Sequence, residues 1–166
     1  GVAVYGSSKI WLRSSSVHSN GLPPSIAPAI LLVGNSELRL DRTIIYNNIW
    51  GILQYDSSSS SINGSDIIYN NVGIVLLKSS SASVAYSHLY NNLWALITYD
   101  NSSLTVENST IHENIYEGIV GYDASRVFLF SSSIINNGFY GITMYDSSVL
   151  KGIDSNISGN IAGIIL

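Results

Sequence analysis

Short apolar blocks alternate with blocks rich in serine and asparagine, and this pattern returns about every 22 residues along the chain. The clearest marker is an asparagine turn followed by a small residue and an aliphatic one, as in Asn48-Ile49-Trp50-Gly51-Ile52. Related runs occur at 70–74, 91–96 and 136–142. Internal repeats of this length are typical of a solenoid, in which each repeat forms one coil and neighbouring coils bury a continuous core.

Alignment of the repeats on the turn asparagine brings three aliphatic positions into register. The anchors are Asn20, Asn48, Asn71, Asn92, Asn114, Asn137 and Asn160, at spacings of 21 to 28 residues. Three positions before them stand Val17, Ile45, Ile68, Leu89, Ile111, Ile134 and Ile157. Earlier in most coils stand Leu12, Leu40, Ile62, Val84, Val106 and Leu129. After the turns come Val2, Ile30, Ile52, Ile74, Leu96, Ile119, Ile142 and Ile164.

These columns predict three short strands per coil, because β-branched residues favour strands and the Ser, Asn and Gly clusters between them favour turns. We therefore predict an all-β fold, a single-domain parallel β-helix over residues 1–166 with about seven coils and no capping helix. Stacked turn asparagines can hydrogen-bond along their column and so satisfy amides that would otherwise be buried without a partner.

One coil is longer than the others. The segment 21–28 contains all three prolines of the chain. Proline cannot donate to a strand ladder, so we expect a loop insertion that leaves the coil, either as a rigid surface bulge or as one wall of a cleft.

On this turn-and-strand repeat the chain resembles the right-handed parallel β-helix proteins of the pectate-lyase-like superfamily. The resemblance covers nearly the whole chain and implies the fold. It says little about function, because that superfamily includes polysaccharide lyases and hydrolases, phage tailspikes, adhesins and surface-layer components. The Asn-Thr-Asp, Asp-Asp, Gly-His-Gly and Arg-Ile-Lys motifs of polygalacturonase-like members do not occur here, so we expect no enzyme activity.

Composition narrows the choice of partner and location. Only 11% of the residues are charged, the formal net charge is −4, and no basic footprint for nucleic acid is evident. The chain has no cysteine and no apolar run long enough to span a bilayer. Four Asn-x-Ser/Thr sequons begin at Asn63, Asn101, Asn108 and Asn156. We expect an extracellular or cell-surface protein, either a processed mature chain or a fragment, with these asparagines as glycosylation candidates.

Candidate chemistry is sparse. Asp100, Asp123 and Asp146 follow equivalent strands in successive coils, and Asp56 belongs to the same column. Carboxylates one strand spacing apart can recruit a calcium ion, although an Asp before Ser or Asn more commonly caps its own turn. The histidines, His18, His88 and His112, are not spaced as a metal site. No cofactor is expected.

Aromatic residues suggest a contact surface. In the strand after the turn, both alternating faces are largely apolar, although a one-layer wall has only one inside. We predict a lateral aromatic face comprising Tyr5, Tyr55, Tyr99, Tyr122 and Tyr145. Trp50, Trp94 and Tyr140 lie near the turns and suit either sugar stacking or packing between protomers.

The two ends of the sequence fall at the same phase of the repeat. The predicted end-to-end interface comprises Val2, Ala3, Val4, Tyr5, Gly163, Ile164, Ile165 and Leu166. Head-to-tail contacts of this kind generate open filaments, and seven coils give an advance of roughly 34 Å per subunit. We therefore predict an extracellular structural protein that assembles with itself into a surface fibre, with Ile165→Asp expected to stop polymerisation. The alternative is a carbohydrate-binding or carbohydrate-active module of a larger surface protein.

Overall fold

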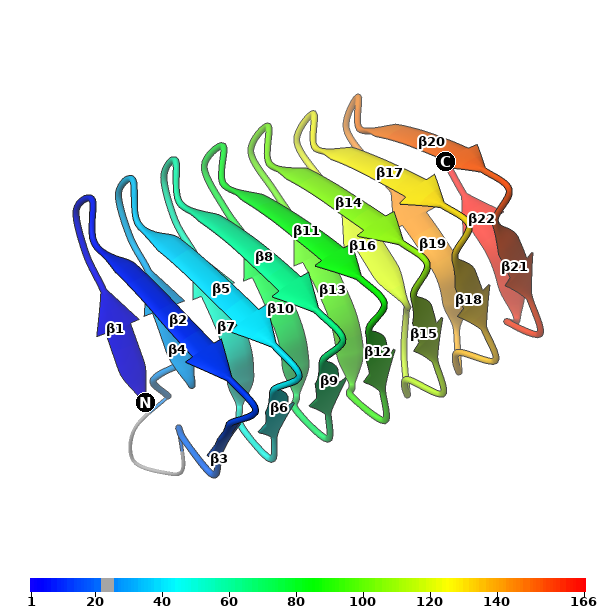
Figure 1. The fold of residues 1–166 in the computed structure, drawn as a ribbon. Helices are drawn as coiled ribbons and strands as arrows, with labels where there is room; N and C mark the ends of the chain where they lie inside the picture. Colours follow the sequence, from blue (N-terminus) through cyan, green and yellow to red (C-terminus); the bar gives the residue numbers. More distant parts are fainter. Residues whose placement is uncertain (22–25) are drawn as a thin grey trace.

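The structure, a computed structural model, describes residues 1–21 and 26–166 as a stack of three-stranded coils (Figure 1). The chain passes in turn through three parallel sheets, named here A, B and C, with eight, seven and seven strands. Every pairing joins a strand to the equivalent strand of the next coil. The predicted all-β parallel solenoid, with about 22 residues per coil, is confirmed, and none of the described residues is helical.

Sheet A contains β1 (Val2–Val4), β4 (Ile30–Leu32), β7 (Trp50–Gln54), β10 (Val72–Leu76), β13 (Trp94–Thr98), β16 (Ile119–Gly121), β19 (Tyr140–Met144) and β22 (Ala162–Ile165). Sheet B contains β2 (Lys9–Arg13), β5 (Glu37–Asp41), β8 (Ser59–Asn63), β11 (Ser81–Ala85), β14 (Ser103–Glu107), β17 (Arg126–Phe130) and β20 (Val149–Ile153). Sheet C contains β3 (Ser16–His18), β6 (Ile44–Tyr46), β9 (Asp66–Ile68), β12 (His88–Tyr90), β15 (Thr110–His112), β18 (Ser133–Ile135) and β21 (Asn156–Ser158).

The core is a set of aliphatic columns, one from each sheet. In sheet A, Ile52, Ile74 and Leu96 are paired in register and fully buried. In sheet B the inward residues alternate with outward polar ones, so that Val84 and Val106 are buried between exposed or half-buried neighbours. The columns predicted for these two sheets are confirmed by the register.

One predicted anchor is wrong. In the third coil Asn70, not Asn71, points into the stack, and Ile67 rather than Ile68 is the buried aliphatic residue of β9. The side chain of Asn71 is exposed. Both members of an Asn-Asn pair fit a turn, and only contact with the adjacent coils decides which of the two lies inside.

The turns between sheets C and A are joined by an asparagine ladder. Each inward asparagine from Asn20 to Asn137 donates its backbone N–H and its side-chain Nδ2–H to the Oδ1 atom of the asparagine in the next coil, at 2.8–3.2 Å. The same Nδ2 groups also donate to backbone carbonyls. The predicted hydrogen bonding along this column is thus present, and it satisfies polar groups in a buried turn.

A second ladder, which the alignment missed, joins the turns between sheets B and C. Here a backbone N–H donates to the hydroxyl of the next coil, as from Ser65 to Ser87 at 3.0 Å and from Ser87 to Ser109 at 3.1 Å. Thr43 and Ser132 take part in the same way. In a chain so rich in serine, the sequence does not distinguish these residues from the serines on the surface.

Half of the predicted Pro-rich insertion at 21–28, residues 22–25, lies outside the described residues.

Both ends of the described stack expose inward-facing positions. The inward side of β20 and β21 lines a hollow of ≈ 480 Å³ with Leu129, Leu150, Ile157 and Ile164. At the opposite end, Val2, Leu12 and Val17 line a second hollow of ≈ 440 Å³.

Candidate functional site: the outer face of sheet A

The outer face of sheet A carries an apolar cluster that is nearly as buried as the core. Leu53, Val75 and Val120 point away from the core, yet they are only 4%, 7% and 4% exposed. The outer cluster, as we name it, consists of Leu53, Val72 and Val75, with Leu31, Trp50, Tyr55, Leu77, Trp94 and Ile97 packed against them. The predicted apolar outer wall is therefore present, but larger side chains cover much of it.

A row of tyrosines runs along one side of this face. The rings of Tyr99 and Tyr122 stack with their centroids 4.7 Å apart and an angle of 9° between their planes. Those of Tyr122 and Tyr145 stack with their centroids 4.9 Å apart and an angle of 12°. Tyr122 thus has a tyrosine ring on each face. Of the predicted lateral column, the structure brings together these three. Tyr55 lies apart, with the Lys78 ammonium 5.9 Å from its ring centroid, and Tyr5 is exposed in the first coil.

The environment of the tyrosine row favours the neutral phenol. Burial raises the pKa of Tyr99, and the nearby carboxylates of Asp123 and Asp100 add to the effect. Burial also raises the pKa of Tyr122, with Tyr99 and Tyr145 contributing next. The hydroxyls of these two residues remain hydrogen-bond donors under neutral conditions.

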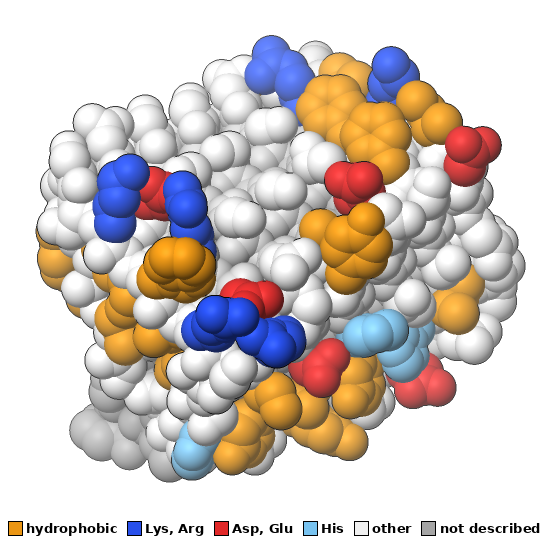
Figure 2. Space-filling model, in the orientation of Figure 1, with side chains coloured by type: hydrophobic (Ala, Val, Ile, Leu, Met, Phe, Trp, Pro, Cys, Tyr) orange, Lys and Arg blue, Asp and Glu red, His pale blue; other side chains and the backbone are white. Residues whose placement is uncertain are grey.

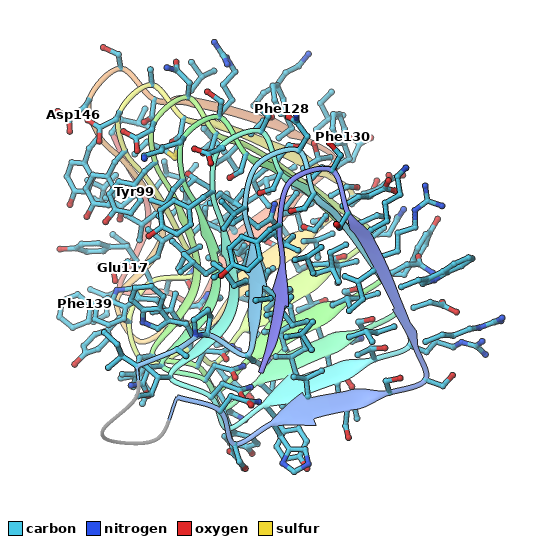
Figure 3. All side chains as sticks on the ribbon, turned by 90° about the vertical axis from the view of Figure 1, so that its left-hand side faces the viewer. Tyr99, Glu117, Phe128, Phe130, Phe139 and Asp146 are labelled. Atoms are coloured by element: carbon cyan, nitrogen blue, oxygen red, sulfur yellow. The ribbon has the colours of Figure 1, made fainter. Side chains whose placement is uncertain are left out.

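A second aromatic row borders the opposite side of the face. The ring centroids of Trp94 and Tyr116 are 4.5 Å apart, and those of Tyr116 and Phe139 are 6.1 Å apart. Trp94 donates its indole N–H to the Glu117 carboxylate at 2.8 Å, which fixes the orientation of the indole. Figure 3 shows Tyr99, Glu117 and Phe139 projecting from the same side of the stack.

The sequence prediction missed Tyr116, Glu117 and Phe139. Their position immediately after the turn asparagines Asn114 and Asn137 was the available signal.

Of the predicted sugar-stacking residues, Trp50 and Trp94 share a column with Val72 between them. Tyr140 lies further along and contacts Phe139 edge-on at 5.7 Å.

Between the two rows lies a hollow of ≈ 280 Å³, lined by Val72, Trp94, Ile97, Tyr99, Val120 and Tyr122. Its floor is aliphatic, and aromatic rings border it on both sides. Because Tyr122 is stacked on both faces, its ring presents its edge and its hydroxyl to solvent rather than a free face. The hollow is suited to an apolar group that enters between the rows.

The aspartate column has a backbone explanation. Asp100, Asp123 and Asp146 have φ values of 52°, 51° and 50°, in the left-handed region where Asp and Asn are enriched among residues other than glycine. Lys78 takes the same conformation in the coil before Asp100. Among the described residues no three His, Asp or Glu side chains gather in an arrangement that could hold a metal ion. The predicted calcium site therefore has no geometric support there.

The histidines lie on the outer face of sheet C. His88 and His112 belong to different columns, as predicted, but their rings meet edge-on at 6.4 Å. His112 also stacks on Tyr90 at 4.9 Å, and His18 stacks on Tyr46 at 4.6 Å. Each imidazole is thus accounted for by aromatic contacts on the surface.

The four sequon asparagines, Asn63, Asn101, Asn108 and Asn156, are all exposed. Within 1–21 and 26–166, no helix has the length and hydrophobicity needed to cross a membrane.

No curated protein and no solved structure matches the chain significantly. A family model described as a right-handed β-helix region does match, over residues 1–162. This match and the parallel coils described above agree in architecture and in extent. The chain therefore belongs to the right-handed β-helix family.

Proposed function

We propose that the chain is a structural module of an extracellular or cell-surface assembly and that it associates with copies of itself. The observation that carries this proposal is the outer face of sheet A, where an apolar cluster outside the core is framed by two aromatic rows. Leu53, Val72 and Val75 are buried in this cluster, but Trp50, Trp94 and Ile97 around them remain partly open to solvent, and exposed apolar surface outside the core is typical of protein contact sites.

A second copy fits this face better than a sugar does. Sugars stack on free aromatic faces, whereas the faces of Tyr122 are occupied by Tyr99 and Tyr145. Trp94 has Tyr116 against it and is tied to Glu117. The floor of the hollow offers aliphatic side chains, which complement the side chains of another protein surface. The exposed sequon asparagines are compatible with glycosylation in the same extracellular setting.

Head-to-tail stacking is the other half of the proposal. The hydrogen bonds of the asparagine ladder all run in one direction, from each asparagine to the one in the next coil. At one end Asn137 donates to Asn160. At the other end Asn20 donates to Asn48, and its Oδ1 atom accepts a hydrogen bond from the Gly1 amino group at 2.6 Å. A following copy placed in register would offer the Oδ1 atom of Asn20 to the Asn160 amide. The apolar hollows at the two ends would close in the same contact.

We expect Ile97→Lys to abolish side-by-side association of the chain without unfolding it. Ile97 is half-buried on the outer face and lines the hollow, so a lysine there places a charge in the contact. Ile44→Lys, on the outer face of sheet C, is the matched control. Sedimentation velocity and electron microscopy measure the outcome. Lateral bundles that persist in Ile97→Lys would rule out this face as the seam.

A substitution at Ile164 tests end-to-end stacking. The register pairs Ile164 with the buried Ile142, whereas Ile165 pairs with Thr143 on the outer side. Because Ile164 faces inward, Ile164→Asp is a more direct test of the seam than the Ile165→Asp variant suggested by the sequence. In Ile164→Asp we expect filaments of the 166-residue chain to be replaced by single short rods, because the seam would bury an unpaired carboxylate.

Two results would contradict these expectations. Filaments that form normally from Ile164→Asp would exclude the end-to-end contact. If neither variant changes assembly, and Trp50→Ala and Trp94→Ala abolish binding on a glycan array, the carbohydrate-binding alternative would replace the self-association proposal.

A further inference from the structure

The most exposed aromatic side chain in the described structure lies on the outer face of sheet B. Trp11 is 67% exposed and stands between Lys9 and Arg13 among the outward residues of β2. The Arg39 guanidinium carbon lies 6.0 Å from the centroid of the Trp11 ring. Trp11, Lys9 and Arg39 take part in lining a hollow of ≈ 290 Å³. An indole that projects in this way offers a large apolar contact area to a partner.

Basic residues surround this indole. Four cations and two carboxylates form ion pairs of 2.6–3.4 Å here: Lys9 and Arg39 with Glu37, and Arg13 and Arg42 with Asp41. These are the charged residues of 1–42, so this part of the chain has a surplus of two positive charges. In Figure 2 basic side chains lie on two sides of a hydrophobic group in this part of the stack, with acidic side chains among them. The basic patch, as we name it, comprises Trp11 and the four cations.

The outer face of sheet A has acidic edges. Residues 43–166 contain nine acidic and three basic residues, and several of the carboxylates border this face. Along one edge, exposed aspartates follow the tyrosine row: Asp100, Asp123 and Asp146. Lys78 stands on the same edge, one coil before them. At the other edge, Glu117 lies beside the second aromatic row, where it accepts the Trp94 indole N–H. The hollow of ≈ 280 Å³ lies between these two edges.

Two copies of the outer face of sheet A do not suit one another in charge. Placed face to face, they bring carboxylates toward carboxylates, and like charges across a contact weaken binding. A partner that complements this face carries cations around an apolar centre. The basic patch of a second copy has this composition.

The basic patch and the outer face of sheet A also match in layout. The hollow on sheet A has an aliphatic floor and aromatic borders, which suit the flat indole of Trp11. Lys9 and Arg13 lie four residues apart on β2, roughly 13 Å, with Trp11 midway between them. The carboxylates lie in the same way, on both sides of the hollow. Glu117 uses Oε2 for the Trp94 indole, and its second carboxylate oxygen can accept from a cation.

We propose that the side-by-side contact joins unlike surfaces, so that Trp11 of one copy enters the hollow on sheet A of the next. Lys9 and Arg13 then face the two acidic edges. This inference rests on the proposed self-association and names the surface that covers the outer face of sheet A. Each copy carries both surfaces at different places, so the contact is heterologous and can repeat from copy to copy. Tryptophan and arginine are enriched among the residues that dominate binding at protein interfaces.

Two variants of the 166-residue chain, each lacking one of the two surfaces, test this contact. Trp11→Ala removes the indole, and Ile97→Lys places a charge in the hollow. Both are made in an Ile164→Asp background, so that end-to-end contacts do not contribute. In sedimentation velocity, association of each variant alone should be weaker than that of the background protein by roughly tenfold or more. An equimolar mixture should form a pair and no larger species, because Trp11 of the Ile97→Lys copy still fits the intact hollow of the Trp11→Ala copy.

Phe128→Ala is the matched control, because Phe128 occupies the same outward column of sheet B as Trp11, five strands further along. This variant should associate as the background protein does. Lys9→Gln/Arg13→Gln should weaken association and make it less dependent on salt. For the background protein, association should weaken as salt is raised from about 0.05 to about 0.3 M, because exposed charges are screened. Equal thermal unfolding of all variants excludes loss of fold as the cause.

Three outcomes would overturn the inference. The first is unchanged association of Trp11→Ala, and the second is loss of association in Phe128→Ala instead. The third is a mixture in which no pair forms although each variant alone is a single chain, which would favour contact between two sheet A faces. If Ile97→Lys alone abolishes association, self-association through sheet A stands and only the role of Trp11 fails. If the background protein does not associate at all, the proposed side-by-side contact fails as well.

Discussion

Replacing Asn70 with leucine is expected to lower the free energy of unfolding by about 3–5 kcal/mol, the largest effect of any polar substitution in this chain. Asn70 is 2% exposed and accepts hydrogen bonds from the backbone N–H and the side chain of Asn48, at 3.0 and 2.9 Å. Its own amide donates to the Ile45 carbonyl at 3.1 Å and to Asn92 at 3.1 Å. Leucine fills a similar volume but can make none of these bonds.

The cost arises because several groups lose their partners together. The Asn48 N–H, the Ile45 carbonyl and the Asn92 Oδ1 atom would each lose a hydrogen bond in a turn closed by its neighbours. A buried polar group without a partner costs about 1–3 kcal/mol. In a solenoid the damage extends to the adjacent coils, because each coil is stabilised by contacts with its neighbours.

The adjacent residue provides the control. Asn71 is the same amino acid one position later, but its side chain is exposed, so Asn71→Leu should change stability by less than about 0.5 kcal/mol. Urea unfolding followed by circular dichroism measures both variants. If Asn71→Leu proved the more damaging of the two, the order of the ladder described here would be wrong.

The second large effect is expected from Gly73→Val, which should destabilise the chain by about 3 kcal/mol, at the upper end of the range for overpacking. Gly73 lies where the turn from sheet C enters sheet A. A Cβ atom there would lie 2.5 Å from the Ala95 carbonyl oxygen and 3.2 Å from a methyl group of Ile67. The carbonyl belongs to the backbone of the next coil, so the clash cannot be relieved by rotating a side chain.

Gly152→Val is the matched control, because a Cβ atom at Gly152 meets nothing within 4 Å. This glycine lies in β20, at the end of the described stack, and we expect its substitution to cost little. Thermal unfolding of the two variants in parallel would separate close backbone approach from the general preference of strands for β-branched residues. Comparable stability of Gly73→Val and the unchanged chain would show that the coils can move apart.

The asparagine turn and the residues after it illustrate how far the sequence alone determines this protein. In a solenoid each residue meets its equivalent in the neighbouring coil, so a hydrophobic column in the alignment is also a column in space. For that reason the strand positions of Ile52, Ile74 and Leu96 and the parallel pairing between coils followed from the period alone. The family of right-handed β-helices followed from the same repeat.

The tertiary structure decided what the period leaves open. Asn70 and Asn71 are chemically identical, and only the fit against Asn48 and Asn92 selects the one that lies inside. The surface groupings were undecided for a related reason. Trp94 donates its indole N–H to Glu117, which stands one position later after its own turn asparagine, and the ring of His88 meets that of His112 from a different column. Periodicity relates equal positions in successive coils, whereas these contacts join unequal positions, whose distances depend on the width and the curvature of the finished coil.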